Sequence, residues 1–146
     1  SRSLHKRAII FPRPMIDSKT LDMSFSGLKT AVLYELRKHE TIDEELKREV
    51  AREFEDAVTD VIISKLELAF DTHLAHTLIL GGGVTANRHI HNACKDFADK
   101  HGIAFLPPAH GLSGDNALMI ALSGAIHNEK GDEIGGKMTA QGNLSL

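Results

Sequence analysis

Two glycine-containing segments carry the residues best suited to chemistry. The first is Gly81-Gly82-Gly83-Val84-Thr85-Ala86-Asn87, where three residues without a Cβ would let backbone N–H groups approach a ribose or a phosphate. Asn87 could add a side-chain hydrogen bond. On the glycines alone a tight turn is the simpler explanation, because the segment is neither a Walker loop ending in GKS/T nor a GxGxxG dinucleotide fingerprint. Gly82, Gly83 and Asn87 are therefore candidate nucleotide-binding residues with a purely structural alternative.

The second segment, Leu112-Ser113-Gly114-Asp115-Asn116, places a carboxylate directly before an apolar stretch. Asp115 could be the N-cap of a helix, which would explain it without any ligand. Its carboxylate could instead bind a hard or borderline metal ion that also contacts phosphate. From these residues alone the cap is the simpler explanation.

The nine histidines suggest a metal site, but their spacing gives it little support. His89 and His91 are two positions apart on a predicted helix and therefore point in different directions. His73 and His76 straddle the end of another predicted helix. The single cysteine, Cys94, can form neither a disulfide within the chain nor a CxxC pair. We therefore do not expect histidines or cysteines of this chain to form a metal centre by themselves.

The predicted elements place both glycine-containing segments at one edge of a sheet. Residues 77–80 and 103–106 predict short strands, the first of them buried. A helix between them should run from an Asn87 cap to a stop at Gly102, and another from 116 to about 127. This order predicts a parallel α/β unit, and ligands of open α/β sheets bind beyond the carboxyl ends of the strands. The 116–127 helix has few charges, so it should be largely buried.

The first half of the chain is predicted to be helical. Ser24 and Ser26 precede helical spacing, which predicts a serine-capped helix over 27–38. Residues 43–73 show the strongest periodicity and predict a long amphipathic helix whose charged face is solvated. Before these helices, residues 8–11 predict a strand or strand end followed by a loop at Pro12-Arg13-Pro14. Beyond 127 we expect a loose segment, 128–146, with at most a short strand over 137–140.

Composition sets broad limits. The 146 residues are 42% apolar and carry a net charge of −3, which suits one domain or one lobe of a larger protein. Bulk charge therefore identifies no class of partner. No apolar run approaches the ~20 residues that cross a membrane, and the chain does not begin like a signal peptide. We expect a soluble protein with no membrane contact, and the single cysteine suits a reducing cytoplasm.

Three stretches, in order along residues 9–125, resemble one family. Phe11-Pro12-Arg13-Pro14 and the LDMSFSGLKT of residues 21–30 are similar to FPRP and LDFSFSGLKT. The GGVTANR of residues 82–88 is similar to GGVSANR. Pro107-Pro108 and the DNALMIA of residues 115–121 are similar to PP and DNAAMIA. On these motifs the chain resembles the C-terminal portion of the TsaD (Gcp) family of tRNA N6-adenosine threonylcarbamoyltransferases, with Met23 in place of a phenylalanine.

The resemblance implies an α/β fold that is part of an actin/Hsp70-like (ASKHA) ATPase lobe. Residues 1–127 would be the C-terminal lobe, with a helical subdomain at 27–73 and an α/β part at 77–127. The implied activity is that of an acyltransferase, which moves a threonylcarbamoyl group from threonylcarbamoyl-adenylate to N6 of adenosine 37 in ANN-decoding tRNA. Gly82, Gly83 and Asn87 would belong to the adenylate or ATP site, and Asp115 would be a ligand of an iron or zinc ion. No residue is identified as a general base.

The chain also departs from the family pattern. The two metal-binding histidines of the family, spaced HxxxH, lie in its N-terminal half, and no His-x3-His occurs here. We therefore expect the chain alone to be inactive and to bind metal weakly. The implied partners are a TsaB-like paralogue and a TsaE-like ATPase, and a homodimer is also expected to be possible. The alternative function is a non-catalytic interaction or dimerisation module, whereas the older peptidase label has no HExxH motif to support it.

Overall fold

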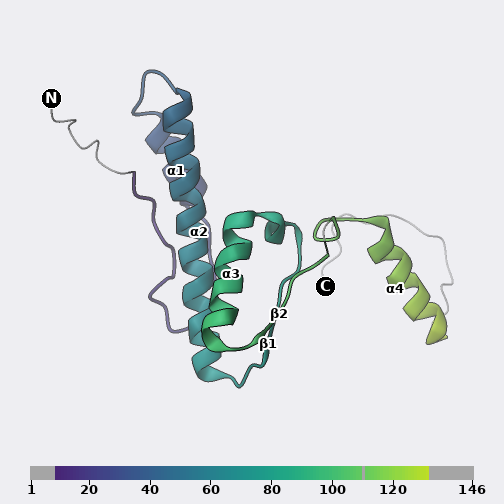
Figure 1. The fold of residues 1–146 in the computed structure, drawn as a ribbon. Helices are drawn as coiled ribbons and strands as arrows, with labels where there is room; N and C mark the ends of the chain where they lie inside the picture. Colours follow the sequence, from purple (N-terminus) through teal and green to yellow (C-terminus); the bar gives the residue numbers. More distant parts are fainter. Residues whose placement is uncertain (1–8, 110, 132–146) are drawn as a thin grey trace.

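A computed structural model describes residues 9–109 and 111–131. Two helices, α1 (Leu28–Leu36) and the much longer α2 (Glu44–Thr72), lie side by side (Figure 1). A strand–helix–strand unit follows: β1 (Thr77–Ile79), the short 3-10 helix η1 (Gly83–Ala86), α3 (Arg88–His101) and β2 (Ala104–Leu106). The last helix, α4 (Ala117–Glu129), stands away from the α2–α3 body (Figure 1). The predicted α/β class is therefore confirmed.

The helix α2 is the central support of the fold. It begins where the Asp43 carboxylate accepts a hydrogen bond from Leu46 N–H at 2.8 Å, and Glu44 and Glu45 lie in its first turn. The cap hydrogen bond stabilises the start of the helix, and the negative charges are favourable there because they lie at the positive end of the helix dipole. One side of α2 packs with α1 and the segment before it in a core formed by Phe11, Leu28, Leu46, Val50 and Ala57. The prediction of one long helix over 43–73 is confirmed.

The segment before α1 departs from two predictions. Gly27, at φ 87°, is the N-cap of α1 and provides no side-chain hydrogen bond. The expected serine cap is wrong because the Ser24 and Ser26 hydroxyls bond to each other at 2.7 Å. Residues 9–11 do not form the expected strand, because Phe11 N–H donates to the Glu53 carboxylate at 2.9 Å instead of to a neighbouring strand. Residue 8 lies outside the described residues.

Residues 13–20 are held on α2 by charged groups. Arg13 Nε donates to Asp60 Oδ2 at 2.9 Å, and Arg13 Nη1 pairs with Glu53. Lys65 is only 5% exposed, and its Nζ donates to Ser18 O, Ser18 Oγ and Thr20 O at 2.8 to 2.9 Å. The prediction that the charged face of α2 is solvated is therefore wrong for Glu53 and Lys65. Contacts with the distant N-terminal segment cover them.

The strands β1 and β2 form a parallel pair, as predicted, in the register Thr77↔Ala104, Leu78↔Phe105 and Ile79↔Leu106. The expectation that the first strand is buried is wrong, since Ile79 is 71% exposed. Leu106 is 54% exposed. The reason is that α3 covers this two-stranded sheet on one side among the described residues, whereas parallel sheets are normally covered on both faces.

The helix α3 forms as predicted between a polar cap and a glycine stop. Asn87 caps its start, and Gly102 at φ 65° ends it in the left-handed conformation that a residue without a Cβ adopts readily. Ile90, Cys94, Phe97 and Ala98 are buried on one side of it. The rings of Phe70 on α2 and Phe97 lie edge to face with centroids 6.1 Å apart, so α3 is fixed against α2.

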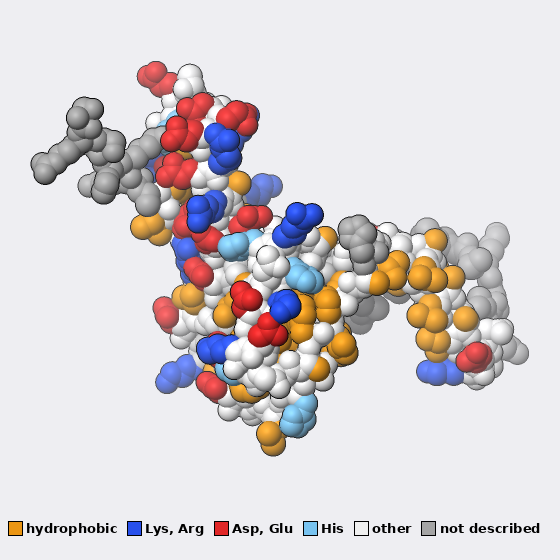
Figure 2. Space-filling view, in the orientation of Figure 1, with side chains coloured by type: hydrophobic (Ala, Val, Ile, Leu, Met, Phe, Trp, Pro, Cys, Tyr) orange, Lys and Arg blue, Asp and Glu red, His pale blue; other side chains and the backbone are white. Residues whose placement is uncertain are grey.

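The expected burial of the last helix is wrong. No residue of α4 is buried, and Leu122 is 60% exposed. Apolar side chains cover much of its surface in Figure 2, so the sequence pattern was correct while the surface that should cover it is missing from the described residues. Among those residues no helix combines the length and apolar character needed to cross a membrane. The helix ends at Glu129, slightly beyond the predicted end, and the strand expected over 137–140 lies outside the described residues.

Candidate functional site

Both glycine-containing segments follow the carboxyl ends of the parallel strands. Leu80 N–H donates to Leu106 O at 3.1 Å, which extends the pairing up to this edge. Gly82 then adopts φ 84° and ψ 163°, a conformation that favours glycine, and starts the η1 turn. The Thr85 hydroxyl donates to Gly82 O at 2.7 Å and closes the turn. A Cβ on Gly81, Gly82 or Gly83 would meet nothing within 4 Å, so the outer side of this tight turn is open to a ligand.

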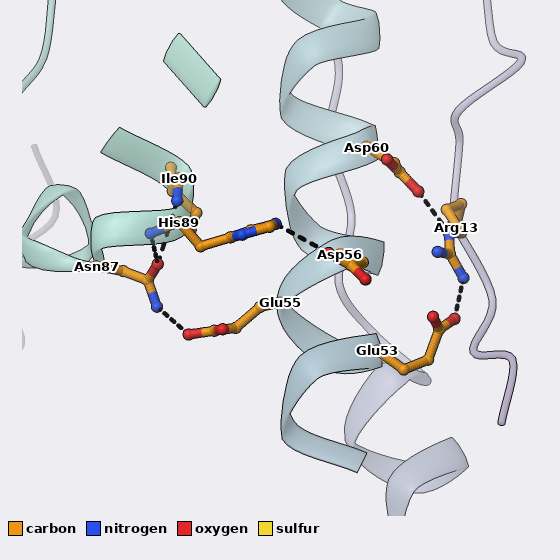
Figure 3. A network of polar contacts seen from close by, with 8 residues as sticks. All are labelled: Arg13, Glu53, Glu55, Asp56, Asp60, Asn87, His89 and Ile90. Atoms are coloured by element: carbon orange, nitrogen blue, oxygen red, sulfur yellow. Dashed lines mark hydrogen bonds and ion pairs between the residues drawn. The ribbon is translucent and has the colours of Figure 1, made fainter. Parts of the chain in front are cut away.

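Asn87 connects this turn to α2 (Figure 3). Its Oδ1 accepts hydrogen bonds from His89 N–H at 2.9 Å and Ile90 N–H at 3.1 Å, which caps α3. Its Nδ2 donates to Glu55 Oε1 at 2.7 Å. His89 Nε2 lies 2.9 Å from Asp56 Oδ1, one position further along α2. The amide group of Asn87 is thus fixed in orientation from two sides, and no other described residue accepts from its second N–H, which can therefore meet a ligand.

Asn87 also lines a large apolar cavity of about 870 Å³, together with residues of α1 and α2. Its walls are mainly apolar, and its polar lining residues are Lys29, Lys47, Glu55 and Asn87. The volume is within the range of small-molecule sites, which are mostly apolar with a few oriented polar groups. The apolar lining residues are Val32, Leu36, Ile42, Val50, Ala51 and Phe54.

A second cavity, of about 450 Å³, lies between the two segments themselves. Thr85 and Ala86 of η1 line it together with Arg88 and His91 of α3. The other wall comes from Pro108, Ala109 and Gly111, which precede the second segment, and from Ser113 within it. The structure therefore brings Thr85 of the first segment and Ser113 of the second to one polar cavity, whereas Asn87 lines the apolar cavity.

Asp115 is placed differently from both expectations. The N-cap of α4 is Asn116, whose Oδ1 accepts from Met119 N–H at 2.9 Å. The cap explanation for Asp115 is therefore wrong. Within residues 9–109 and 111–131 its exposed carboxylate has no hydrogen bond or ion pair, and no group of three or more histidine, cysteine or acidic residues could hold a metal ion. Asp115 can offer one ligand, but the described residues do not complete a metal site.

Comparison with known proteins identifies the family. Residues 1–122 match the family model described as TsaD: tRNA N6-adenosine threonylcarbamoyltransferase. The chain belongs to this family. The family expected from the three motifs is thereby confirmed.

Curated relatives carry the same family name. The tRNA N6-adenosine threonylcarbamoyltransferase of Thermosipho melanesiensis is 42% identical over 118 residues, which are 81% of this chain and 35% of that protein. The enzyme of Thermosipho africanus is 38% identical over 136 residues, 93% of this chain and 41% of that protein. That of Burkholderia mallei is 42% identical over 125 residues, 82% and 36% respectively. The chain thus spans little more than a third of the length of these relatives.

Arg13 and Lys29, which belong to the TsaD-like motifs at the start of the chain, have different environments. Arg13 is occupied by Glu53 and Asp60 and is not free to bind a ligand. Burial raises the pKa of Glu53, but hydrogen bonds from Arg13 and from Phe11 N–H outweigh burial and leave the pKa below its usual value. Lys29 lines the apolar cavity. Of these two cations, only Lys29 is positioned to meet a ligand in that cavity.

Sequence reasoning missed two residues of the polar cavity, and the structure also excludes Cys94 as a nucleophile. Arg88 and His91 were not predicted as site residues. They are three positions apart at the start of α3, however, and this spacing places both on one side of the helix. Cys94 is fully buried, and burial raises the pKa of its thiol. A neutral, covered thiol is a poor nucleophile, so Cys94 is not a catalytic candidate.

Proposed function

We propose that this chain carries the nucleotide-binding part of a tRNA N6-adenosine threonylcarbamoyltransferase. The observation that carries this proposal is the position of Asn87, whose oriented amide follows an open glycine turn and lines an apolar cavity of about 870 Å³. The base of the adenylate would occupy the apolar cavity. Its ribose would lie against Gly82 and Gly83 and accept or donate a hydrogen bond at Asn87.

In the proposed reaction the N6 amine of adenosine 37 in ANN-decoding tRNA attacks the carbamoyl carbon of threonylcarbamoyl-adenylate. The N6–C bond forms, the bond from that carbon to the phosphate oxygen breaks, AMP leaves and the amine loses a proton. The role of the described residues would be binding and orientation, because exposed backbone N–H groups near Gly82 and Gly83 can stabilise negative charge on the nucleotide. We assign no general base.

A bound iron or zinc ion would polarise oxygen atoms of the substrate. Asp115 is suited to be one of its ligands, since the carboxylate is exposed. The described residues offer no complete site, so we derive no step through the ion. The remaining metal ligands would come from the part of the family's length that this chain does not span. The proposed protein partners are a TsaB-like paralogue and a TsaE-like ATPase, and the proposed location is the cytoplasm.

Titration of the 146-residue chain with AMP tests the nucleotide site. Asn87→Ala should weaken AMP binding about tenfold, as expected for a lost hydrogen bond to an oriented amide. The matched control is Asn92→Ala, because Asn92 is an exposed residue of the same helix. Equal affinities of the two variants would contradict the site. Formation of threonylcarbamoyl-adenosine in tRNA by the chain alone would contradict its proposed inactivity.

A second candidate function, the interaction module, is favoured by the exposure of α4. Leu118, Ile120 and Leu122 are each at least 60% exposed, and such a surface is normally covered by a partner. The partner would be a second copy or a TsaB-like paralogue. Light scattering over a range of concentrations tests this function, because a dimer that Leu122→Glu dissociates would support it. A monomer at all concentrations, together with Asn87-dependent AMP binding, would leave the nucleotide-binding function as the better account.

A further inference from the structure

The polar cavity contains three side chains able to donate hydrogen bonds and free to do so. Arg88 and Ser113 make no side-chain hydrogen bond or ion pair within the part of the chain that the structure describes. His91 likewise makes no side-chain hydrogen bond or ion pair among the described residues. Its ring contacts Phe105 edge to face, with the ring centroids 5.4 Å apart. The fourth polar residue, Thr85, already uses its hydroxyl proton on Gly82 O. The cavity therefore combines a guanidinium, an imidazole and a hydroxyl from two different segments.

Among the described residues that line the cavity, Arg88 is the one that carries a formal charge, and it is positive. None of the described residues that line the cavity is acidic, and Asp115, two positions beyond Ser113, is not part of the lining. Arg52 on α2 provides the contrast, since the shallow cavity that it lines also contains Glu49, Glu53 and Asp56. An anion would be attracted to Arg88, whereas the carboxylates around Arg52 would offset much of the attraction to that guanidinium. This difference rests on neighbouring charges alone, because both arginines are exposed and lack a side-chain hydrogen bond among the described residues.

We propose that the polar cavity lined by η1, α3, Pro108, Ala109, Gly111 and Ser113 binds a phosphate group, with Arg88 as its main contact. A guanidinium presents two parallel N–H groups to two phosphate oxygens. Ser113 on the other wall and His91 on the next turn of α3 line the same cavity and offer donors for further oxygens. A tetrahedral anion uses donors from several directions, whereas a carboxylate has only two oxygens to offer.

The position of the cavity separates this phosphate from the nucleoside pocket. Asn87 faces the apolar cavity and Glu55, while Thr85, Ala86 and Arg88 line the polar one. The phosphate could belong to the adenylate, reached across η1, or to the backbone of the tRNA. Which of these supplies it rests on the proposed function, whereas binding of a free phosphate anion does not.

The first experiment is an NMR titration of the 15N-labelled 146-residue chain with inorganic pyrophosphate. Arg88→Ala should weaken binding about tenfold or more, and Arg88→Lys should retain part of the affinity because it keeps the charge but loses the planar fork. Arg52→Ala is the matched control and should change affinity less than about twofold. Since Arg88 and Arg52 are both exposed, amide spectra should show that both variants keep the fold. Equal affinities of the wild-type chain and Arg88→Ala would overturn the proposal.

The second experiment repeats the comparison with AMP and with tRNA. Loss of AMP affinity in Arg88→Ala would assign the phosphate to the nucleotide. Loss of tRNA affinity, with a salt dependence reduced by about one unit, would assign it to the tRNA backbone. Pyrophosphate binding through Arg88 without affinity for AMP or tRNA would support the phosphate site and contradict the proposed function. AMP or tRNA binding that depends on Asn87 but not on Arg88, together with a pyrophosphate affinity that Arg88→Ala leaves unchanged, would support the proposed function and contradict the phosphate site.

Discussion

Replacement of Asn87 should reveal how much of the site's stability depends on one amide. Asn87→Ala removes two interactions at once. The first is the cap on His89 and Ile90 N–H, and the second is the 2.7 Å hydrogen bond to the Glu55 carboxylate. Asn87→Ser removes only the second, because a serine hydroxyl can still cap a helix.

The two losses can be given separate magnitudes. Loss of an N-cap side chain costs about 1 kcal/mol. The hydrogen bond to Glu55 joins half-buried groups and should contribute about 1 kcal/mol after solvent screening. We therefore expect the free energy of unfolding to fall by about 2 kcal/mol in Asn87→Ala and by about 1 kcal/mol in Asn87→Ser.

Urea unfolding followed by circular dichroism at 222 nm measures these changes, because most of the described structure is helical. Glu55→Ala and the double variant with Asn87→Ala complete a double-mutant cycle. The cycle should give a coupling of about 1 kcal/mol between the two side chains. A coupling indistinguishable from zero, or equal losses in the alanine and serine variants, would refute the reasoning. AMP affinity in the serine variant then separates a binding role of the amide from its structural one.

Three further predictions concern charged and buried groups on α2 and α3. Lys65→Met should lower the free energy of unfolding by about 3 kcal/mol in urea titrations, because it leaves the backbone carbonyls of Ser18 and Thr20 without their donor. Glu53 has a pKa below the ordinary 4.5 in the folded chain. Its stabilisation is therefore complete above the unfolded pKa and is lost as pH falls through the folded pKa, so the destabilisation by Glu53→Gln should be larger at about pH 7 than at about pH 3 in thermal unfolding. Cys94 should react with a thiol reagent only when the chain unfolds, and rapid labelling of the native chain would contradict its burial.

Local signals in the sequence predicted the elements that carry their own boundaries. Asn87 is a cap whose side chain bonds within three residues, and Gly102 ends α3 through its own backbone conformation. Such interactions can be read from short stretches of chain. The parallel pairing of β1 and β2 also followed, because a strand–helix–strand order leaves few alternatives.

Long-range contacts were not predictable in the same way. The bonds from Phe11 to Glu53 and from Lys65 to Ser18 join positions more than forty apart, and no periodic pattern marks them. The exposure of α4 could not be predicted either, because apolar composition shows that a helix needs covering but not what covers it. For the site, composition and motifs led to Asn87 and to both segments. They did not reveal Arg88 and His91, since a cavity between two loops depends on how the loops approach each other.

The long helix α2 has a mechanical consequence. Its 29 residues extend about 43 Å, and within two turns it holds Arg13 through Glu53 and Asp60 on one side and Asn87 and His89 through Glu55 and Asp56 on the other (Figure 3). A hydrogen-bonded helix bends little over two turns, so this stretch acts as a stiff beam between the N-terminal segment and the start of α3. We therefore expect a displacement of Asn87 to change the contacts of α2 with the segment near Phe11. The rate of hydrogen exchange at the Phe11 amide, whose N–H donates to Glu53, would then report ligand binding at Asn87.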